Sequence, residues 1–306
     1  MSIVSNILIT GANGQLGSEL RFLLENGNIS ETLKNATLFF TDQGELDITD
    51  LKAVETYLKA YSVSIIINCA AYTAVDKAED EPELCEKVNS VAPGNLAKAA
   101  QANGALLLHI STDYVFDGNG PVPYKESDKR DPQSVYGATK VKGEDAIINS
   151  GVQYVIIRTS WLYSQYGNNF VKTIHKLSCE KPSLNVVFDQ IGTPTYARDL
   201  AGAILEICSK YLSQRERSRD AKFPFGVYHY SNEGVCSWYD FALEISSNSC
   251  KNCNIAPVTS DLFPTKAKRP AYSVMDKSKI KLTFGLNIPH WRDSLQKYYK
   301  NLGVNN

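Results

Sequence analysis

The sequence has almost no net charge and no long hydrophobic run. Its 32 Lys and Arg residues nearly balance 33 Asp and Glu residues, which leaves a formal net charge of −1 over 306 residues. Such a chain has no general positive field that would attract a nucleic acid or an anionic membrane. No apolar segment reaches the roughly 18 residues that a transmembrane helix needs, and the N-terminal residues show no secretory signal. We therefore expect a cytoplasmic protein that binds neither nucleic acids nor membranes.

Cysteine and histidine are few and scattered, which argues against a metal centre. The chain has seven cysteines and four histidines. Cys250 and Cys253 form a lone C-x-x-C without the second cysteine or histidine pair that a structural zinc site requires. We expect a surface loop with reduced thiols there, with a metal or redox role as the lesser alternative. The histidines are isolated in the sequence, and structural roles are expected for His109, His175, His229 and His290.

Strand and helix patterns alternate through the first half of the chain. Apolar runs typical of buried parallel strands cover residues 3–10, 37–41, 63–71, 105–110 and 154–158. Helical periods separate these runs, so the repeated units predict an α/β fold with a Rossmann-type, doubly wound parallel sheet. Ligands bind such sheets at the carboxyl ends of the strands. The residues at these predicted ends are Gly11, Asp42, Ala71 and Thr112.

The second half is less regular, because prolines divide it into short pieces that are rich in aromatic residues. We expect residues 1–160 to form a dinucleotide-binding domain. Residues 161–306 are then largely a smaller, irregular C-terminal substrate-binding lobe. Segments near 184–212 are expected to add to the sheet of the first domain.

A glycine pattern follows the first predicted strand. Gly11, Gly14 and Gly17 are spaced as G-x-x-G-x-x-G and precede a helical period. The first glycine allows a tight turn, the second lets a pyrophosphate approach the backbone, and the third lets the helix pack on the strand. The free N–H groups of a helix N-terminus then bind the phosphates. A purely structural glycine turn is the lesser alternative.

Three further residues are assigned to the adenosine end of this site. Asp42 ends the second predicted strand, where a carboxylate accepts hydrogen bonds from ribose hydroxyls. Because an acid disfavours a 2′-phosphate, NADH should at least be tolerated. The alternative is that Asp42 only caps a turn. Asp47 and Ile48 are weaker candidates for contact with the adenine.

Tyr136 is followed four residues later by Lys140 and lies 24 residues after Thr112. Positions i and i+4 share one face of a helix. A tyrosine with a pKa of about 10 moves protons poorly at neutral pH, and a nearby ammonium lowers that pKa. Thr112 can donate a hydrogen bond to the same substrate oxygen, and Lys140 can also bind the nicotinamide ribose and position the hydride donor. With the glycine turn, this set predicts hydride transfer between a nicotinamide and a carbonyl carbon, with Tyr136 as the proton donor.

These residues resemble the extended short-chain dehydrogenase/reductase superfamily, and within it the dTDP-4-dehydrorhamnose reductase family. The resemblance covers nearly the whole chain and rests on eight segments. They are ILITGANGQLGSEL (7–20), INCAAYTAVDKAEDEP (67–82), STDYVFDG (111–118), VYGATKVKGE (135–144), IRTSWLY (157–163), GNNF (167–170), DQIGTPTYARDLA (189–201) and KRPAYSVMD (268–276). It implies reduction of the 4-keto group of dTDP-4-dehydro-6-deoxy-L-mannose to dTDP-L-rhamnose. It also implies NADPH as the usual coenzyme, with NADH accepted by some members.

The resemblance also implies roles for individual residues. The catalytic residues would be Thr112, Tyr136 and Lys140. The cofactor phosphates would contact Gly14, Gln15 and Leu16. Further cofactor contacts would come from Ala71, Tyr72 and Thr73. The sugar would contact Val75, Asp113, Tyr114 and Trp161, although Trp161 has a core aromatic role as its alternative. The nucleotide diphosphate would contact Asn169 and Arg269.

One departure from the family pattern concerns assembly. Some relatives dimerise through a magnesium site that is built from acidic residues, and Glu19 matches one of its positions. Ala197 stands where the dimeric type carries a second acid. We therefore expect a monomer, with a Mg²⁺-bridged dimer as the lesser alternative.

Two other functions remain as alternatives to the reductase. An epimerase or dehydratase acting on a nucleotide sugar would use the same fold but retain its cofactor through each cycle. A non-catalytic regulatory subunit, like that of methionine adenosyltransferase, would tolerate loss of the tyrosine or lysine. Tyr136 and Lys140 are both present, which favours an enzyme.

Overall fold

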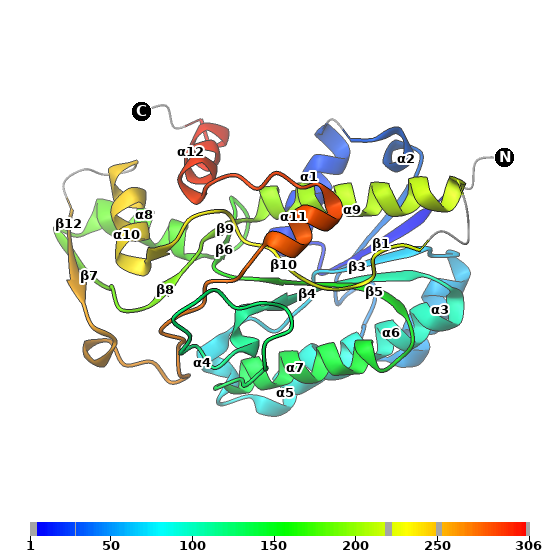
Figure 1. Ribbon diagram of the computed structural model, residues 1–306, viewed down its shortest axis with the longest axis horizontal. Helices are drawn as coiled ribbons and strands as arrows, with labels where there is room; N and C mark the ends of the chain where they lie inside the picture. Colours follow the sequence, from blue (N-terminus) through cyan, green and yellow to red (C-terminus); the bar gives the residue numbers. More distant parts are fainter. Residues whose placement is uncertain (1–4, 28, 218–221, 249–252, 304–306) are drawn as a thin grey trace.

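The computed structural model describes residues 5–27, 29–217, 222–248 and 253–303. Within them the centre is a six-stranded sheet whose neighbouring strands all run parallel (Figure 1). In chain order the strands are β1 (Asn6–Thr10), β2 (Thr37–Thr41), β3 (Ile65–Asn68), β4 (Leu106–Thr112), β5 (Gln153–Thr159) and β10 (Gly226–His229). Their spatial order is β10-β5-β4-β3-β1-β2. The predicted Rossmann-type parallel sheet is confirmed.

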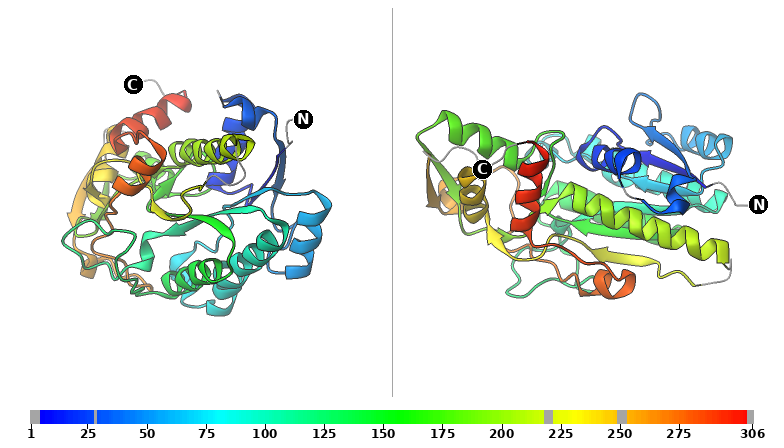
Figure 2. Two further views of the ribbon diagram at one scale, coloured as in Figure 1. Left: turned by 45° about the vertical axis from the view of Figure 1, so that its right-hand side comes forward. Right: turned by 90° about the horizontal axis from the view of Figure 1, so that it is seen from above.

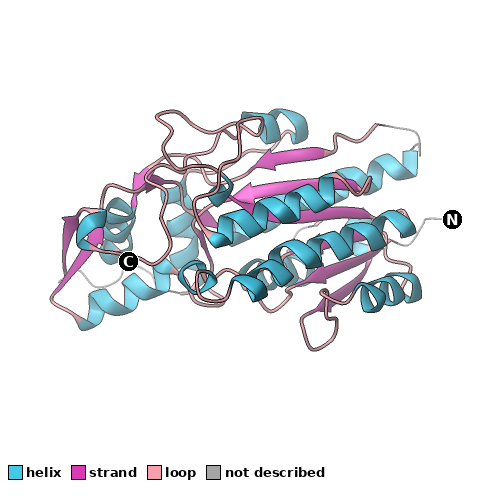
Figure 3. Cartoon of the chain, turned by 90° about the horizontal axis from the view of Figure 1, so that it is seen from below, coloured by secondary structure: helices cyan, strands magenta, loops and turns pink. Residues whose placement is uncertain are grey.

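Helices cover both faces of this sheet (Figure 2). Above it in Figure 1 lie α1 (Gln15–Asn26), α2 (Glu31–Lys34), α9 (Ala197–Arg217) and α11 (Ser278–Phe284). Below it lie α3 (Leu51–Ala60), α6 (Ala92–Asn103) and α7 (Val135–Ile148), the face seen in Figure 3. Each layer has its own apolar core with the strands. Because both faces are covered, β3 buries all four of its residues and does not alternate.

Short elements connect the strands at their carboxyl ends. They are α4 (Val75–Ala78), α5 (Pro82–Glu86), the π-helical turn η1 (Lys87–Val91) and the 3₁₀ turn η2 (Asp113–Val115). The side chain of Asn89, in η1, accepts a hydrogen bond from the Tyr72 N–H at 2.9 Å and donates to the Tyr72 carbonyl at 3.0 Å. The π-helical turn therefore fixes the backbone at Tyr72, which follows the carboxyl end of β3.

A third apolar core, rich in aromatic side chains, lies beyond the carboxyl edge of the sheet. Its helices are α8 (Phe170–Glu180), α10 (Trp238–Ser247) and α12 (Trp291–Asn301), with the 3₁₀ turn η3 (Ser260–Leu262) nearby. Its small sheets pair β6 (Leu162–Tyr163) with β9 (Thr195–Tyr196), β7 (Ser183–Val187) with β12 (Asn254–Val258), and β8 (Ile191–Gly192) with β11 (Cys236–Ser237). The sequence predicted a smaller substrate-binding lobe in this half of the chain, and its substrate-binding role stays a prediction.

The expectation that segments near 184–212 add to the main sheet is wrong. Strand β7 pairs with β12 in a separate two-stranded sheet, and residues 197–217 form the long helix α9. The sixth strand is β10, which pairs with β5. A parallel strand needs a crossover of a dozen or more residues, and α9 covers the sheet before the chain returns to β10.

Two expectations concerned the environment of the chain. In the described part of the structure, no helix is long and apolar enough to cross a membrane. Cys253 is a free thiol, whereas Cys250 lies outside the described residues. Cys179, in α8, is disulfide-bonded, a state that a reducing compartment does not favour. A cytoplasmic location therefore stays a prediction.

Candidate active site

The glycine turn begins where β1 ends. Gly11 has a φ of 65°, and a Cβ there would lie 2.6 Å from the Ala70 backbone nitrogen. A Cβ on Gly17 would lie 2.5 Å from the Gly11 carbonyl oxygen, so Gly17 allows α1 to pack closely on the turn. Gly14 is the N-cap residue of α1, and as a glycine it has no side chain that could accept from the first N–H groups of the helix. Those backbone N–H groups are therefore available to an anion. The strand order changes direction between β1 and β3, where doubly wound sheets form their crevice.

A cavity of about 510 Å³ lies at this crevice. Among the residues predicted to bind the cofactor, it is lined by Gly11, Gly14, Asp42, Asp47, Ile48, Ala71 and Tyr72. Asp42 both lines the cavity and holds the turn, because its carboxylate accepts hydrogen bonds from the Asn13 N–H at 3.1 Å and the Gln43 N–H at 3.0 Å. No Lys or Arg is among the described residues that line this cavity.

A second cavity, of about 600 Å³, adjoins the first and shares Gly14, Cys69 and Ala71 with it. Among the other predicted site residues, it is lined by Gln15, Leu16, Thr73, Val75, Thr112, Asp113, Tyr114, Tyr136, Lys140, Trp161 and Arg269. These residues come from the ends of several strands and from α7, which are far apart in the sequence. The structure thus brings the glycine turn and the Thr-Tyr-Lys set into one continuous space.

Helix α7 carries the tyrosine and the lysine. Its N-terminus is capped by Ser134, whose hydroxyl accepts a hydrogen bond from the Gly137 N–H at 3.1 Å. The Tyr136 ring lies edge-on to Tyr114, with their centroids 5.4 Å apart. Burial raises the pKa of Tyr136 above its ordinary value, and a hydrogen bond with Thr112 lowers it. A cation must therefore assist this phenol before it can act as a neutral-pH acid–base group.

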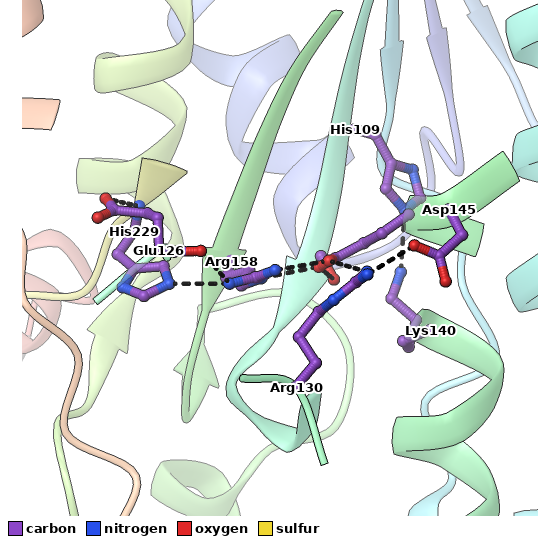
Figure 4. Close-up of polar contacts among 9 residues, drawn as sticks. His109, Glu126, Arg130, Lys140, Asp145, Arg158 and His229 are labelled. Carbon is purple, nitrogen blue, oxygen red and sulfur yellow. Dashed lines mark hydrogen bonds and ion pairs between the residues drawn. The ribbon is translucent and has the colours of Figure 1, made fainter. Parts of the chain in front are cut away.

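Lys140 is almost fully buried, with 1% of its surface exposed. Its Nζ donates to the Ile110 carbonyl at 2.7 Å and lies 3.2 Å from Nε2 of His109, as Figure 4 shows. Burial lowers the pKa of Lys140 to about 8, and Glu144 acts in the opposite direction. The lysine is thus poised to change its protonation state near neutral pH.

Asp113 presents an unpartnered oxygen. Its Oδ1 accepts a hydrogen bond from the Thr112 hydroxyl at 2.9 Å, and its buried Oδ2 has no hydrogen-bond partner among the described residues. Burial raises the pKa of this carboxyl to about 6, and the hydrogen bond from Thr112 lowers it. A buried acceptor without a partner costs free energy. Since Asp113 lines the cavity, a ligand hydroxyl would satisfy it.

Arg269 and the Trp161–Trp238 pair form another wall of the cavity. Arg269 donates to the Tyr114 hydroxyl at 3.0 Å and to Asp76 at 2.5 Å. Trp161 stacks on Trp238 with centroids 3.6 Å apart, and its φ is 48°. A bulky residue with positive φ is strained, and such strain is often found at functional sites. Trp161 therefore lies at the cavity wall, while its ring also packs against the aromatic core.

Comparison with known proteins agrees with this site. The family model described as the RmlD substrate binding domain matches residues 5–304. The chain belongs to the dTDP-4-dehydrorhamnose reductase family. A dTDP-4-dehydrorhamnose reductase of Aggregatibacter actinomycetemcomitans is 39% identical to it, over 96% of this chain and 98% of the relative.

Solved structures of reductases of this family are also similar. The one from Clostridium acetobutylicum has a TM-score of 0.88 and 42% identity, covering 97% of this chain and 99% of its own. The one from Bacillus anthracis, in complex with NADP, has a TM-score of 0.88 and 39% identity, covering 98% of this chain and 100% of its own. The similarity thus spans both the sheet and the C-terminal lobe.

Asn169 was predicted to contact the nucleotide diphosphate, but it does not line either of the two cavities described above. Its side chain caps α8 by accepting from the Lys172 N–H at 3.1 Å, and it donates to Gln15 at 3.0 Å. It therefore orients Gln15, which does line the cavity. The preceding residues, Gly167 and Asn168, line the cavity in its place.

Several lining residues were not predicted from the sequence. They are Cys69, Ile110, Ser111, Thr159, Ser160, Leu162, Gly167, Asn168 and Trp238. The rule that ligands bind at strand carboxyl ends could have found Cys69, Thr159 and Ser160, which lie at the ends of β3 and β5. The sequence pattern held no signal for Trp238, because only the folded lobe stacks it on Trp161.

Glu19, which matches one position of the magnesium site in the dimeric relatives, is buried and already has partners. Its carboxylate is buried, accepting from Nε of Arg198 at 2.7 Å and from the Ser164 hydroxyl at 2.8 Å. Ala197, at the start of α9, is also buried. Within the described ranges, no group of three or more His, Cys, Asp and Glu residues could hold a metal ion.

Proposed function

We propose that this protein reduces the 4-keto group of dTDP-4-dehydro-6-deoxy-L-mannose, giving dTDP-L-rhamnose. The observation that carries this proposal is the continuous space that joins the glycine turn to Thr112, Tyr136 and Lys140. Relatives named dTDP-4-dehydrorhamnose reductase match nearly the whole chain. The unpartnered Oδ2 of Asp113 is an acceptor for a sugar hydroxyl in the same space.

NADPH is the proposed coenzyme, and NADH is accepted. Free N–H groups at the start of α1 and the close backbone approach at Gly14 fit a dinucleotide pyrophosphate. The related structure from Bacillus anthracis contains NADP. Acceptance of NADH follows from Asp42, whose carboxylate can bond ribose hydroxyls and repels a 2′-phosphate.

In this proposal the bound reduced nicotinamide supplies a hydride to the carbonyl carbon. Thr112 and Tyr136 hydrogen-bond the carbonyl oxygen, and Tyr136 gives it a proton as charge develops there. The ammonium form of Lys140 stabilises the phenolate that Tyr136 becomes. Asp113 accepts a sugar hydroxyl and orients the ring, while the Trp161–Trp238 wall limits the access of water.

The nucleotide part of the substrate is assigned to an adjoining cavity of about 680 Å³. This cavity shares Tyr114, Trp238 and Arg269 with the catalytic cavity. Its other lining residues include Phe170 and Lys181. Aromatic side chains suit a base, and Arg269 suits a diphosphate.

The test is oxidation of NADPH by the purified chain, with the 4-keto-6-deoxy sugar nucleotide supplied by the enzymes that form it. The expected result is a stoichiometric loss of reduced-nicotinamide absorbance together with formation of dTDP-L-rhamnose. Absence of turnover with both NADPH and NADH would overturn the reductase. Turnover without added coenzyme, by protein purified with bound NAD, would indicate an epimerase or dehydratase. Coenzyme binding without turnover of any nucleotide sugar would indicate a regulatory subunit.

A further inference from the structure

His109 lies in the interior of the sheet, next to the catalytic lysine. It sits on β4 beside Asn68 of β3, and both side chains are fully buried. Its Nδ1 lies 2.9 Å from Nδ2 of Asn68, and its Nε2 lies 3.2 Å from Nζ of Lys140. Figure 4 shows the ring above the lysine that α7 presents. The histidine that the sequence suggested to be structural thus contacts a proposed catalytic group.

The surroundings of Asn68 fix which ring nitrogen of His109 carries the proton. The Oδ1 of Asn68 accepts from the Ala70 backbone N–H at 3.1 Å and from the Thr10 hydroxyl at 2.7 Å. A backbone N–H can only donate, so the amide oxygen must face it and the amide NH₂ must face His109. Nδ1 is then the acceptor. Burial, followed by the charge of Lys140, lowers the pKa of His109 well below its ordinary range, so the ring is neutral with its proton on Nε2.

This tautomer of His109 determines the protonation state of Lys140. The Nε2–H of His109 points at Nζ, and Nζ also donates to the Ile110 carbonyl at 2.7 Å. An ammonium has three donors and no acceptor, whereas a neutral amine has a lone pair. Only the neutral amine accepts the hydrogen bond from His109. With an ammonium, two donors would face each other in a buried site, which is costly.

We propose that Asn68 and His109 hold Lys140 as a neutral amine in the cofactor-free protein, and that Lys140 takes up a proton from solvent when the dinucleotide binds. The inference rests on the proposed function, since it deepens the role of the same site. The proton adds to the Nζ lone pair, and Nζ turns from His109 towards the cavity. His109 and Asn68 are positioning residues that couple cofactor binding to the charging of the catalytic lysine.

Several other titratable and charged groups surround Lys140. The pKa of Lys140 is lowered to about 8, because burial lowers it by more than Glu144 and Cys85 raise it. The hydrogen bond from His109 acts in the same direction as burial. The titratable and charged groups that face this part of α7 from packed elements are Glu79, Cys85, His109, Asp113, Tyr136, Glu144 and Arg158.

The proton uptake can be measured by calorimetric titration of the full chain with NADPH at about pH 8, in buffers of different ionisation enthalpy. At this pH the cofactor phosphate is fully ionised in solution, because its second pKa is about 6. We expect uptake of about half a proton or more for each cofactor bound, because a lysine with a pKa of about 8 is half neutral at this pH. Binding without proton uptake would overturn this inference and leave the reductase intact. Absence of binding would instead contradict the proposed function.

Two variants remove the hydrogen bond that His109 donates to Lys140. In Asn68→Asp the carboxylate still accepts from Ala70 and Thr10 but also accepts the proton of Nδ1, so Nε2 becomes an acceptor for the ammonium. In His109→Gln the amide can turn its oxygen towards Nζ. In both variants we expect the pKa of Lys140 in the free protein to rise by at least about one unit, a tenfold gain in proton affinity. Proton uptake on binding then falls towards zero.

His229→Gln is the matched control. His229 is also fully buried in the sheet, on β10, but its Nε2 lies 3.4 Å from Arg158 and not beside Lys140. This change alters neither charge nor the lysine's partners, so proton uptake should equal that of the unmodified chain. Uptake that falls equally in the control and in His109→Gln would contradict a specific role for His109.

A measurement on the unmodified chain tests the same inference without depending on whether the variants fold. Nitrogen NMR of the histidine rings in the cofactor-free protein reports which nitrogen is protonated, and His109 is assigned by its absence in His109→Gln or by its contacts with Asn68. We expect a neutral ring with the proton on Nε2. A proton on Nδ1, or on both nitrogens, would overturn the inference.

Discussion

Tyr136 illustrates how a single residue depends on its surroundings. Burial raises its pKa, so the phenol gives up its proton only when a cation stabilises the phenolate. Thr112 and Lys140 line the same cavity. We therefore expect the three side chains to act as a unit, so that loss of any one of them lowers mainly turnover.

Tyr136→Phe should lower turnover by about 10²–10⁴-fold, because the phenol that donates the proton is lost. NADPH binding should change little, since the ring stays in place. Steady-state kinetics and a fluorescence titration of NADPH check the two parts separately. Turnover equal to that of the unmodified chain would remove Tyr136 from its assigned role.

Asp113→Asn should make the protein more stable at neutral pH and impair substrate binding. Burial raises the pKa of Asp113 to about 6 from 3.8. The folded state therefore binds the extra proton, and the unmodified chain loses stability as the pH rises through this window. We expect the free energy of unfolding to rise by about 1–3 kcal/mol at pH 7, with no gain below about pH 4.

Chemical denaturation at the two pH values checks this expectation, and Asp261→Asn, at an exposed residue, is the control. A gain that is the same at both pH values would mean that the charge of Asp113 is not its cause. An unchanged substrate KM would mean that its Oδ2 does not bind the sugar.

Asp42→Ala tests whether Asp42 contributes to the preference between NADH and NADPH. The carboxylate lines the crevice directly after β2, and it is proposed to accept hydrogen bonds from the ribose hydroxyls. Its removal should raise the KM for NADH more than the KM for NADPH, because a 2′-phosphate gains from the loss of the nearby negative charge. Parallel kinetics with both coenzymes measure the ratio. Equal changes would mean that Asp42 serves the turn alone, through its bonds to Asn13 and Gln43.

At the scale of elements, the position of α7 on the sheet decides the geometry of the site. Glu144, in the middle of α7, accepts hydrogen bonds from Arg158 of β5 at 2.7 and 2.9 Å and from Ser111 of β4 at 2.6 Å. Arg130 reaches the same carboxylate at 3.2 Å (Figure 4). Lys140 lies one turn earlier on this helix, so the buried ion pair fixes where the lysine enters the cavity.

Glu144→Gln should destabilise the protein by about 3–5 kcal/mol, because it leaves the buried charge of Arg158 without its partner. Denaturation followed by circular dichroism measures the change. Glu86→Gln, which removes an exposed ion pair with Lys142, is a matched control that should cost less than about 1 kcal/mol. Equal effects of the two changes would show that the ion pair of Glu144 does not secure α7.

At the scale of the whole molecule, three adjoining cavities run from the glycine turn to the C-terminal lobe. They share Gly14 and Ala71 on one side and Tyr114 and Arg269 on the other. The dinucleotide crevice belongs to the sheet, while the aromatic core beyond its carboxyl edge supplies Trp238 and Phe170. The proposed substrate site therefore lies where the two halves of the chain meet.

The chain should be a monomer whose mass does not respond to magnesium. Glu19, the residue that matches the metal-bridged dimer, is already bound to Arg198 and Ser164. Light scattering after size exclusion, with Mg²⁺ and with a chelator, measures this. A dimer that dissociates on removal of Mg²⁺ would contradict the expectation.

The sequence by itself determined the parallel sheet, the glycine turn and the Thr112, Tyr136 and Lys140 set. These features rest on short-range patterns, because buried strands, tight turns and helix faces are set by residues close in the chain. Only the tertiary structure decided that β10, and not a segment near 184–212, completes the sheet. It also decided that Asn169 orients Gln15, and that Trp238 and Asn168 line the cavity. Contact between His109 and Lys140 arises in the same way, because packing between a strand and a helix joins residues 31 positions apart. Such contacts depend on long-range packing, which no local pattern encodes.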